Sequence, residues 1–76
     1  MTRDDIYKAI DIERNRQDRL HPTWPADAHK ALAVLAEEFG EVAEALNDGR
    51  ERGLRAELVQ VAAVAVRWLE SMEVMQ

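Results

Sequence analysis

Five side chains that carry oxygen ligands stand in two short segments and could do chemistry together. Glu37, Glu38 and Glu41 lie in the first segment, and Glu57 and Gln60 lie in the second. At about 100° per residue, side chains three positions apart are neighbours on a helix, which pairs Glu38 with Glu41 and Glu57 with Gln60. In an antiparallel helical hairpin the two pairs would face each other. Such a set of oxygens suits a hard divalent cation.

The same glutamates also fit the solvated face of an amphipathic helix, which is a common pattern. Like charges three or four positions apart cost an exposed helix only about 0.2–0.5 kcal/mol. Burying them without a cation costs far more. Whether this group is exposed or gathered around an ion therefore decides between a solubility role and a chemical one.

The length and composition of the chain indicate a small domain that needs support. It has 76 residues, no cysteine and a net charge of −5. A domain of this size buries only about 60% of its surface on folding. Disulfides are excluded and no cysteine and histidine cluster offers a structural zinc site, so we expect a homo-oligomer.

Charge and hydropathy exclude two classes of partner. The acidic balance argues against duplex nucleic acid, because binding to a phosphate backbone needs a concentrated positive surface. The longest apolar run, residues 61–66, is too short to span a bilayer. We therefore expect no membrane partner and a soluble, cytoplasmic protein.

Local signals predict three helices in one domain that covers residues 1–76. Thr2 is a candidate N-cap, with Asp5 completing a variant of the capping box. Pro22 and Pro25 break the chain into a connecting loop. Gly49 ends the next helix, and the short charged turn after it makes the flanking helices antiparallel neighbours. The helices are expected at about residues 4–18, 27–47 and 52–74.

The apolar pattern predicts that the third helix is buried on every side. Between Leu58 and Leu69 apolar residues cover nearly its whole circumference, and three short helices of one chain cannot surround it. We therefore expect an all-α fold, in which three-helix protomers dimerise to form a four-helix-bundle core. The first helix has a sparse apolar stripe and should pack at the edge. The stripe of the second helix comprises Leu32, Leu35, Ala36, Phe39, Val42, Ala43 and Leu46.

The two acidic segments resemble those of the MazG-like, all-alpha nucleoside triphosphate pyrophosphatase superfamily. Upstream of them, residues 14–17 and His21-Pro22 resemble the first helix and loop of its small phage- or prophage-type members. That family is marked by Glu-Glu-x-x-Glu on one helix and Glu-x-x-Asp on the next. The resemblance covers residues 32–69. The matching segments are Glu37-Glu38-Phe39-Gly40-Glu41 and Glu57-Leu58-Val59-Gln60.

The resemblance implies hydrolysis of ribo- or deoxyribonucleoside triphosphates to monophosphate and pyrophosphate, as a house-cleaning activity on the nucleotide pool. It implies dependence on Mg²⁺, with Mn²⁺ as a substitute, and an obligate dimer or dimer of dimers. By position in the motif Glu38, Glu41 and Glu57 are metal ligands, with Gln60 at the fourth position. Glu37 would assist a second metal or the attacking water, so the catalytic set is Glu37, Glu38, Glu41 and Glu57.

Gln60 is the departure from the pattern, because the family has aspartate there. An amide carbonyl can still bind magnesium as a neutral donor, but the site loses one negative charge. Three interpretations follow: a working site with an altered metal demand, a site that binds nucleotide without efficient turnover, and a degenerate homologue. The alternative to an enzyme is a catalytically weak or inactive helical module that binds nucleotide or a protein partner.

Cations and one aromatic residue are candidates for binding the substrate. Each cation fits a surface or salt-bridge role equally well. The tryptophan between the prolines could stack on a base or anchor its loop to the core. The candidates are Lys30, Arg55 and Arg67 on the second and third helices, Arg14, Arg16 and Gln17 on the first helix, and Trp24 in the loop.

Overall fold

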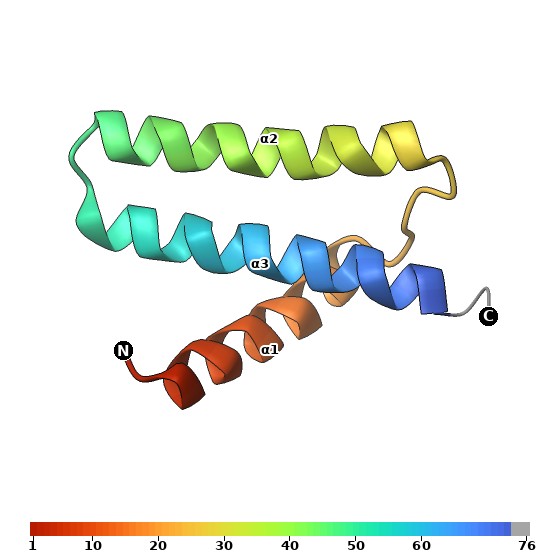
Figure 1. Ribbon diagram of the computed structural model, residues 1–76, viewed down its shortest axis with the longest axis horizontal. Helices are drawn as coiled ribbons and strands as arrows, with labels where there is room; N and C mark the ends of the chain where they lie inside the picture. The colour runs from red at the N-terminus through yellow and green to blue at the C-terminus, as the bar shows by residue number, and fades with distance from the viewer. Residues whose placement is uncertain (74–76) are drawn as a thin grey trace.

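Three helices make up the part of the chain that the structure describes. The computed structural model describes residues 1–73 and, within them, contains no strand, which confirms the all-α prediction. The expected end of the last helix at Val74 lies outside the described residues. Within residues 1–73, no helix combines the length and apolar character needed to cross a membrane. The helices are α1 (Arg3–Leu20), α2 (Ala28–Asn47) and α3 (Glu51–Glu73) (Figure 1).

The first helix begins at the predicted capping box. The Thr2 hydroxyl accepts a hydrogen bond from the Asp5 backbone N–H, and the Asp5 carboxylate accepts one from the Thr2 N–H, each at 3.1 Å. These contacts satisfy backbone donors that have no partner inside a helix. The helix continues two residues beyond its expected end, to Leu20. Pro22 follows at once, and a residue before proline avoids helical geometry.

The turn between α2 and α3 is shorter than predicted, because α3 begins at Glu51. Gly49 adopts the left-handed conformation with φ of 68°, which glycine enters at the least steric cost. The Arg50 N–H donates to the Ala45 carbonyl at 3.2 Å, which closes a Schellman motif. A turn of this length folds α3 back along α2, as the antiparallel prediction required.

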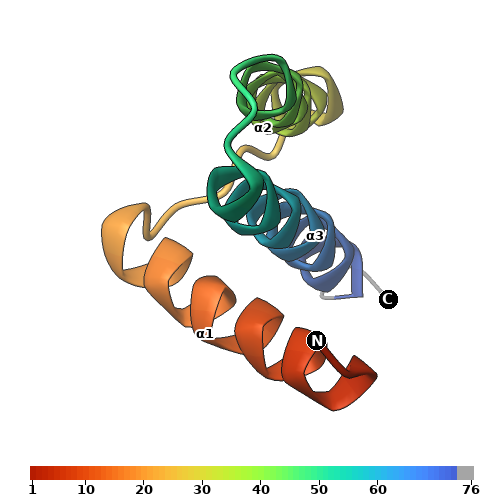
Figure 2. The same cartoon turned by 90° about the vertical axis from the view of Figure 1, so that its left-hand side faces the viewer.

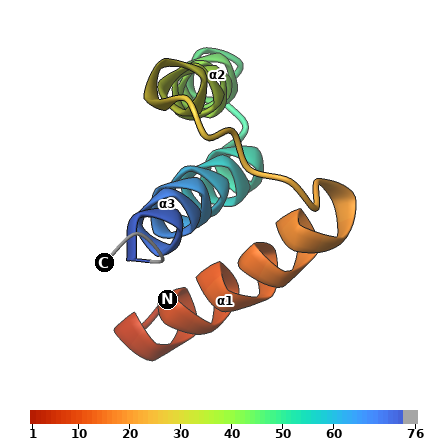
Figure 3. The same cartoon turned by 90° about the vertical axis from the view of Figure 1, so that its right-hand side faces the viewer.

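Helix α3 lies between the other two helices. Figures 2 and 3 show α2 on one side of it and α1 on the other, with the segment 21–27 passing around one flank of α3. The edge position predicted for the first helix is therefore confirmed, because among the three helices of residues 1–73 α1 packs against α3 and not against α2. The fully buried apolar positions are small or of medium size, which lets the helices approach closely. They are Ala31, Ala45, Ala63 and Val64.

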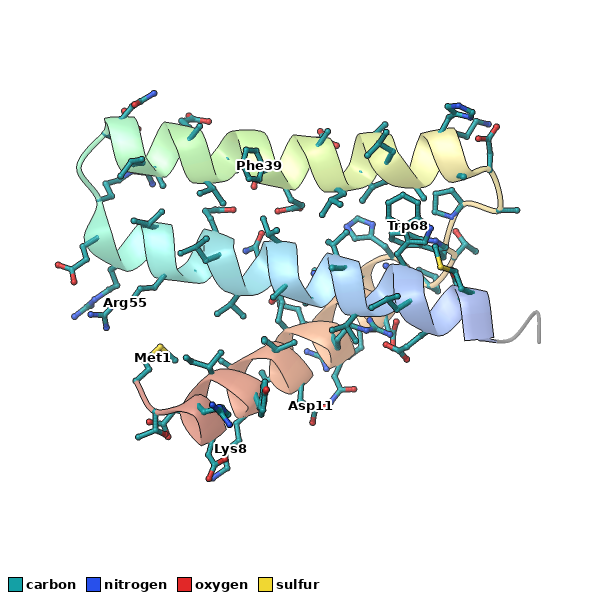
Figure 4. The ribbon with its side chains drawn as sticks, in the orientation of Figure 1. Met1, Lys8, Asp11, Phe39, Arg55 and Trp68 are labelled. Atoms are coloured by element: carbon teal, nitrogen blue, oxygen red, sulfur yellow. The ribbon has the colours of Figure 1, made fainter. Side chains whose placement is uncertain are left out.

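Large apolar side chains remain exposed along one side of the α2–α3 hairpin. Phe39 is 65% exposed and Leu69 is 60% exposed, and Figure 4 shows Phe39 projecting from the side of α2 turned toward the viewer. Five of the seven residues in the stripe predicted for the second helix are therefore exposed rather than covered by α3. We call this surface the apolar face. It consists of Leu32, Ala36, Phe39, Ala43 and Leu46 on α2 with Leu58, Leu69 and Met72 on α3.

Candidate metal and nucleotide site

Three carboxylates meet where α2 and α3 run side by side. Glu38 and Glu41 are one helical turn apart on α2, and Glu57 lies opposite them on α3. One oxygen from each residue lies within 4.8 Å of the others. The antiparallel hairpin thus brings together the three glutamates that the sequence placed in one cluster.

Burial and mutual repulsion make Glu38 and Glu57 hard to ionise. The pKa of Glu38 is raised to about 7, first by burial and then by the negative charges of Glu41 and Glu57. The pKa of Glu57 is also raised, first by burial and then by its contact with Glu41. A positive charge placed among these oxygens would reverse both effects.

Two of the carboxylate oxygens lack any hydrogen-bond partner among the described residues. Glu38 Oε2 and Glu57 Oε2 are both buried from solvent. A buried oxygen without a hydrogen-bond donor is costly, and its presence in a folded protein needs an explanation. A divalent cation would account for them, since Mg²⁺ binds carboxylate oxygens and keeps several waters in its shell. The three glutamates therefore fit the group that the motif implies.

A pocket of about 610 Å³ opens beside the carboxylates, and we call it the carboxylate pocket. It lies on the flank of α3 that the segment 21–27 follows. At about 100° per residue, Phe39 points roughly 160° away from both Glu37 and Glu41 on α2, so pocket and apolar face lie on opposite sides of the hairpin. The pocket is lined by Glu13, Arg16, Gln17, Leu20, His21, Pro22, Thr23, Trp24, Pro25, Val34, Glu37, Glu38, Glu41, Gln60, Val64 and Arg67.

Arg67 holds the loop that forms the far wall of this pocket. Its guanidinium donates to the backbone carbonyls of His21 and Thr23, the latter at 3.2 Å. Its Nε also lies 3.7 Å from the Asp18 carboxylate. Arg67 is only 9% exposed, so its charge is balanced by these oxygens rather than by water. Both contacts with the loop come from one guanidinium nitrogen, Nη2.

Trp24 both anchors this loop and lines the pocket. The Arg67 Cζ atom lies 5.3 Å from the centroid of its ring, within cation–π range. The ring of Trp68 on α3 lies 6.5 Å away and is tilted by 45°. These contacts support the anchoring role of Trp24. Trp24 also lines the pocket, so its ring stays a candidate for stacking on a base.

Helix α1 contributes three polar side chains to the pocket, Glu13, Arg16 and Gln17. Glu13 is not among the site residues predicted from the sequence. Arg16 contacts Glu13 at 3.0 Å, and the Gln17 amide donates to the same carboxylate at 3.2 Å. The charge of Glu13 also raises the pKa of Glu38. Nothing in the sequence distinguishes Glu13 from the other charged residues of α1, because its meaning depends on which side of α1 faces α3.

Three of the candidate cations lie outside the carboxylate pocket. Arg14 pairs with Asp18 and with Glu70, at 3.0 and 2.7 Å, on another side of the contact between α1 and α3. Arg55 pairs with Glu51 at 3.0 Å, and Figure 4 shows it at the opposite end of α3 from Trp68. Lys30 is exposed in the first turn of α2. The structure does not bring these three residues to the carboxylates.

Glu37 and Gln60 both line the pocket. Glu37 is exposed and stands outside the group of three close carboxylates, as its place on the helix indicated. Gln60 lies one turn beyond Glu57 on α3, and its backbone carbonyl accepts a hydrogen bond from Gln17 at 3.4 Å. Both residues therefore face the space beside the cluster.

Comparison of the chain with known protein families, with curated proteins and with solved structures found no match.

Proposed function

We propose that the chain is a Mg²⁺-dependent nucleoside triphosphate pyrophosphohydrolase of the MazG-like type. The observation that carries the proposal is the group of three close carboxylates, with two unpartnered buried oxygens, at the edge of a pocket of about 610 Å³. A pocket with this chemistry suits a ligand that brings metal-bound phosphates to one end and a planar base to the other. The substrate class is a ribo- or deoxyribonucleoside triphosphate.

In this proposal Glu38, Glu41 and Glu57 hold the cation, and the side-chain carbonyl of Gln60 is the neutral fourth donor. When bound, the metal neutralises phosphate oxygens and makes phosphorus more open to attack. Glu37 lines the pocket outside the cluster and orients a water or removes its proton. The water oxygen bonds to the α-phosphorus, and the bond from this phosphorus to the oxygen that bridges it to the β-phosphate breaks. Pyrophosphate leaves with the bridging oxygen.

Arg16 is the cation best placed to meet the phosphates. It lines the pocket and its side chain is 50% exposed. Its partner Glu13, whose side chain is only 13% exposed, keeps the hydrogen bond from the Gln17 amide when Arg16 turns to a ligand. Arg67 supports the reaction indirectly, because it holds the His21 and Thr23 carbonyls and the Trp24 ring. Trp24 then provides the surface on which a base rests.

The apolar face supports the proposed dimer or dimer of dimers. Soluble monomers seldom expose a continuous apolar surface that spans two helices. The exposed residues on α2 recur at spacings of three and four, and those on α3 lie eleven and three residues apart, on one side of that helix. Together they make a stripe that a second hairpin can pack against to form a four-helix core. The pocket lies on the opposite side, so this assembly leaves it open.

The proposal is tested by assaying pyrophosphate release from a panel of ribo- and deoxyribonucleoside triphosphates with Mg²⁺ or Mn²⁺. Release that requires the metal and that yields the monophosphate is expected for at least one nucleotide. No release across the panel would contradict the enzymatic proposal. Metal-dependent nucleotide binding without release would favour the non-catalytic alternative, in which the loss of charge at Gln60 prevents turnover.

A further inference from the structure

Gln17 is an unusual residue to find buried in α1. It is 7% exposed and is the only buried residue of this helix, all of which lies in the described part of the chain. Glutamine is rarely buried, since its amide then needs partners on both its nitrogen and its oxygen. An apolar side chain would fill the same place without that demand.

The amide of Gln17 is satisfied on its nitrogen alone. Nε2 donates to the Glu13 carboxylate at 3.2 Å and to the Gln60 carbonyl at 3.4 Å. Both partners can only accept hydrogen bonds, which sets the orientation of the amide. The remaining oxygen, Oε1, has no partner among residues 1–73. This oxygen is buried from solvent in a residue that lines the carboxylate pocket, so it is an oriented, unpaired acceptor suited to a ligand that donates a hydrogen bond.

The position of Gln17 along α1 determines which part of a bound nucleotide would lie next to it. Along α1, Glu13 stands one turn before it beside the carboxylates, and Leu20 stands one turn after it beside the segment that carries Trp24. Gln17 is therefore midway between the acidic end and the aromatic end of the carboxylate pocket. An ionised triphosphate has no hydrogen to donate, which leaves the sugar as the nearest donor.

We propose that Gln17 Oε1 accepts a hydrogen bond from a sugar hydroxyl of a nucleotide bound in the carboxylate pocket. The inference rests on the proposed function and extends it to recognition of the sugar. A site with a buried acceptor rejects an analogue that lacks the matching donor, because the acceptor is then left unpaired. The side chain therefore favours nucleotides that keep a 3′-hydroxyl over 2′,3′-dideoxynucleotides.

The test measures binding of two non-hydrolysable ligands with Mg²⁺, an α,β-methylene deoxynucleoside triphosphate and its 2′,3′-dideoxy counterpart with the same base. The wild-type chain should bind the deoxy ligand about tenfold more tightly. In Gln17→Met, which keeps the shape but removes the acceptor, the two ligands should bind equally. Asn15→Met is the matched control, because Asn15 is an exposed amide of α1 that does not line this pocket, and it should discriminate as the wild type does.

Three results would overturn the inference while leaving the proposed function intact. The first is equal binding of both ligands by the wild type, and the second is unchanged discrimination in Gln17→Met. A uniform loss of affinity for both ligands in Gln17→Met would also overturn it, because that result assigns Gln17 to packing alone. Binding without pyrophosphate release in the parallel assay would instead contradict the enzymatic proposal and would leave the recognition of the sugar standing.

Discussion

The two sides of the α2–α3 hairpin are built from the same two helices but differ in charge and polarity. One side presents Glu37 and Glu41 to a pocket, with Glu38 and Glu57 in the seam behind them. The other side exposes the apolar face, in which Phe39 is 65% exposed. Only half a turn of helix separates these two surfaces.

Each side carries a cost that a different partner would remove. Carboxylates whose buried oxygens lack donors lose hydration without compensation, and a cation would compensate for that loss. Exposed apolar surface costs about 25 cal/mol per Å², and a second copy of the chain would cover it. Both sides of the hairpin thus carry groups without partners among residues 1–73, for opposite reasons.

The largest effect is expected from removing one charge of the acidic side. Glu41→Gln keeps the shape of an exposed side chain but takes a ligand charge from the cluster. Metal-dependent turnover should fall by about 100-fold or more, since even changes around metal ligands cost roughly 10- to 100-fold. Steady-state pyrophosphate release measures it.

Glu44→Gln is the matched control for this change, because Glu44 is an exposed glutamate one turn further along α2 and outside the cluster. It should retain the activity of the wild type. Equal turnover in Glu41→Gln and the wild type would remove Glu41 from the site.

The next effect concerns the apolar side. Phe39→Glu places a charge on the surface that the proposed dimer buries, twice in each symmetric pair. Losing a buried aromatic contact costs about 1.5–3 kcal/mol per copy, and the buried charge adds to this. The dissociation constant of the dimer should therefore rise by about 100-fold or more, as measured by sedimentation.

Ile12→Glu on α1 provides the control for Phe39→Glu. Ile12 is 68% exposed, close to the exposure of Phe39, but it lies away from the apolar face. Its variant should assemble as the wild type does. A wild-type chain that stays monomeric at micromolar concentration would refute the role of the apolar face.

A smaller gain is expected when the missing charge is restored. Gln60→Asp should raise the affinity for Mg²⁺ or the turnover by about three- to tenfold, because carboxylates bind this ion better than amides do. Metal titration and pyrophosphate release measure the two quantities. If neither changes while Glu41→Gln abolishes activity, Gln60 lies outside the first shell of the metal.

The smallest effect is a dependence of stability on pH in the metal-free chain. The pKa of Glu38 is about 7 in the folded chain against an ordinary value of 4.5. Between these values the folded state binds more protons than the unfolded state, so the free energy of unfolding falls as pH rises. The melting temperature should drop by roughly a few degrees from pH 5 to pH 8.

Saturating Mg²⁺ should reverse much of this loss at pH 8, because it stabilises the charged carboxylates. Glu38→Gln should flatten the pH profile, since it removes the group whose pKa is raised most clearly. A metal-free chain whose melting temperature rises between pH 5 and pH 8 would contradict this account of the cluster.

The sequence by itself determined the helices and the spacing of the acidic residues. Thr2 with Asp5 and Gly49 act through contacts within a few residues, so their local chemistry set the helix boundaries to within two residues. The meeting of Glu38, Glu41 and Glu57 followed from helical periodicity and one tight turn. Because these features depend on contacts within short stretches of chain, they could be predicted from the sequence.

Only the tertiary structure decided which side of α1 faces α3, and with it the composition of the pocket. Gln17 and Glu13 line the pocket, whereas Arg14 pairs with Glu70 elsewhere. The sequence of α1 is polar on most sides and contains no pattern that selects one of them. The rotation of a helix about its axis depends on packing between residues far apart in the chain, which local periodicity does not encode when the apolar stripe is thin.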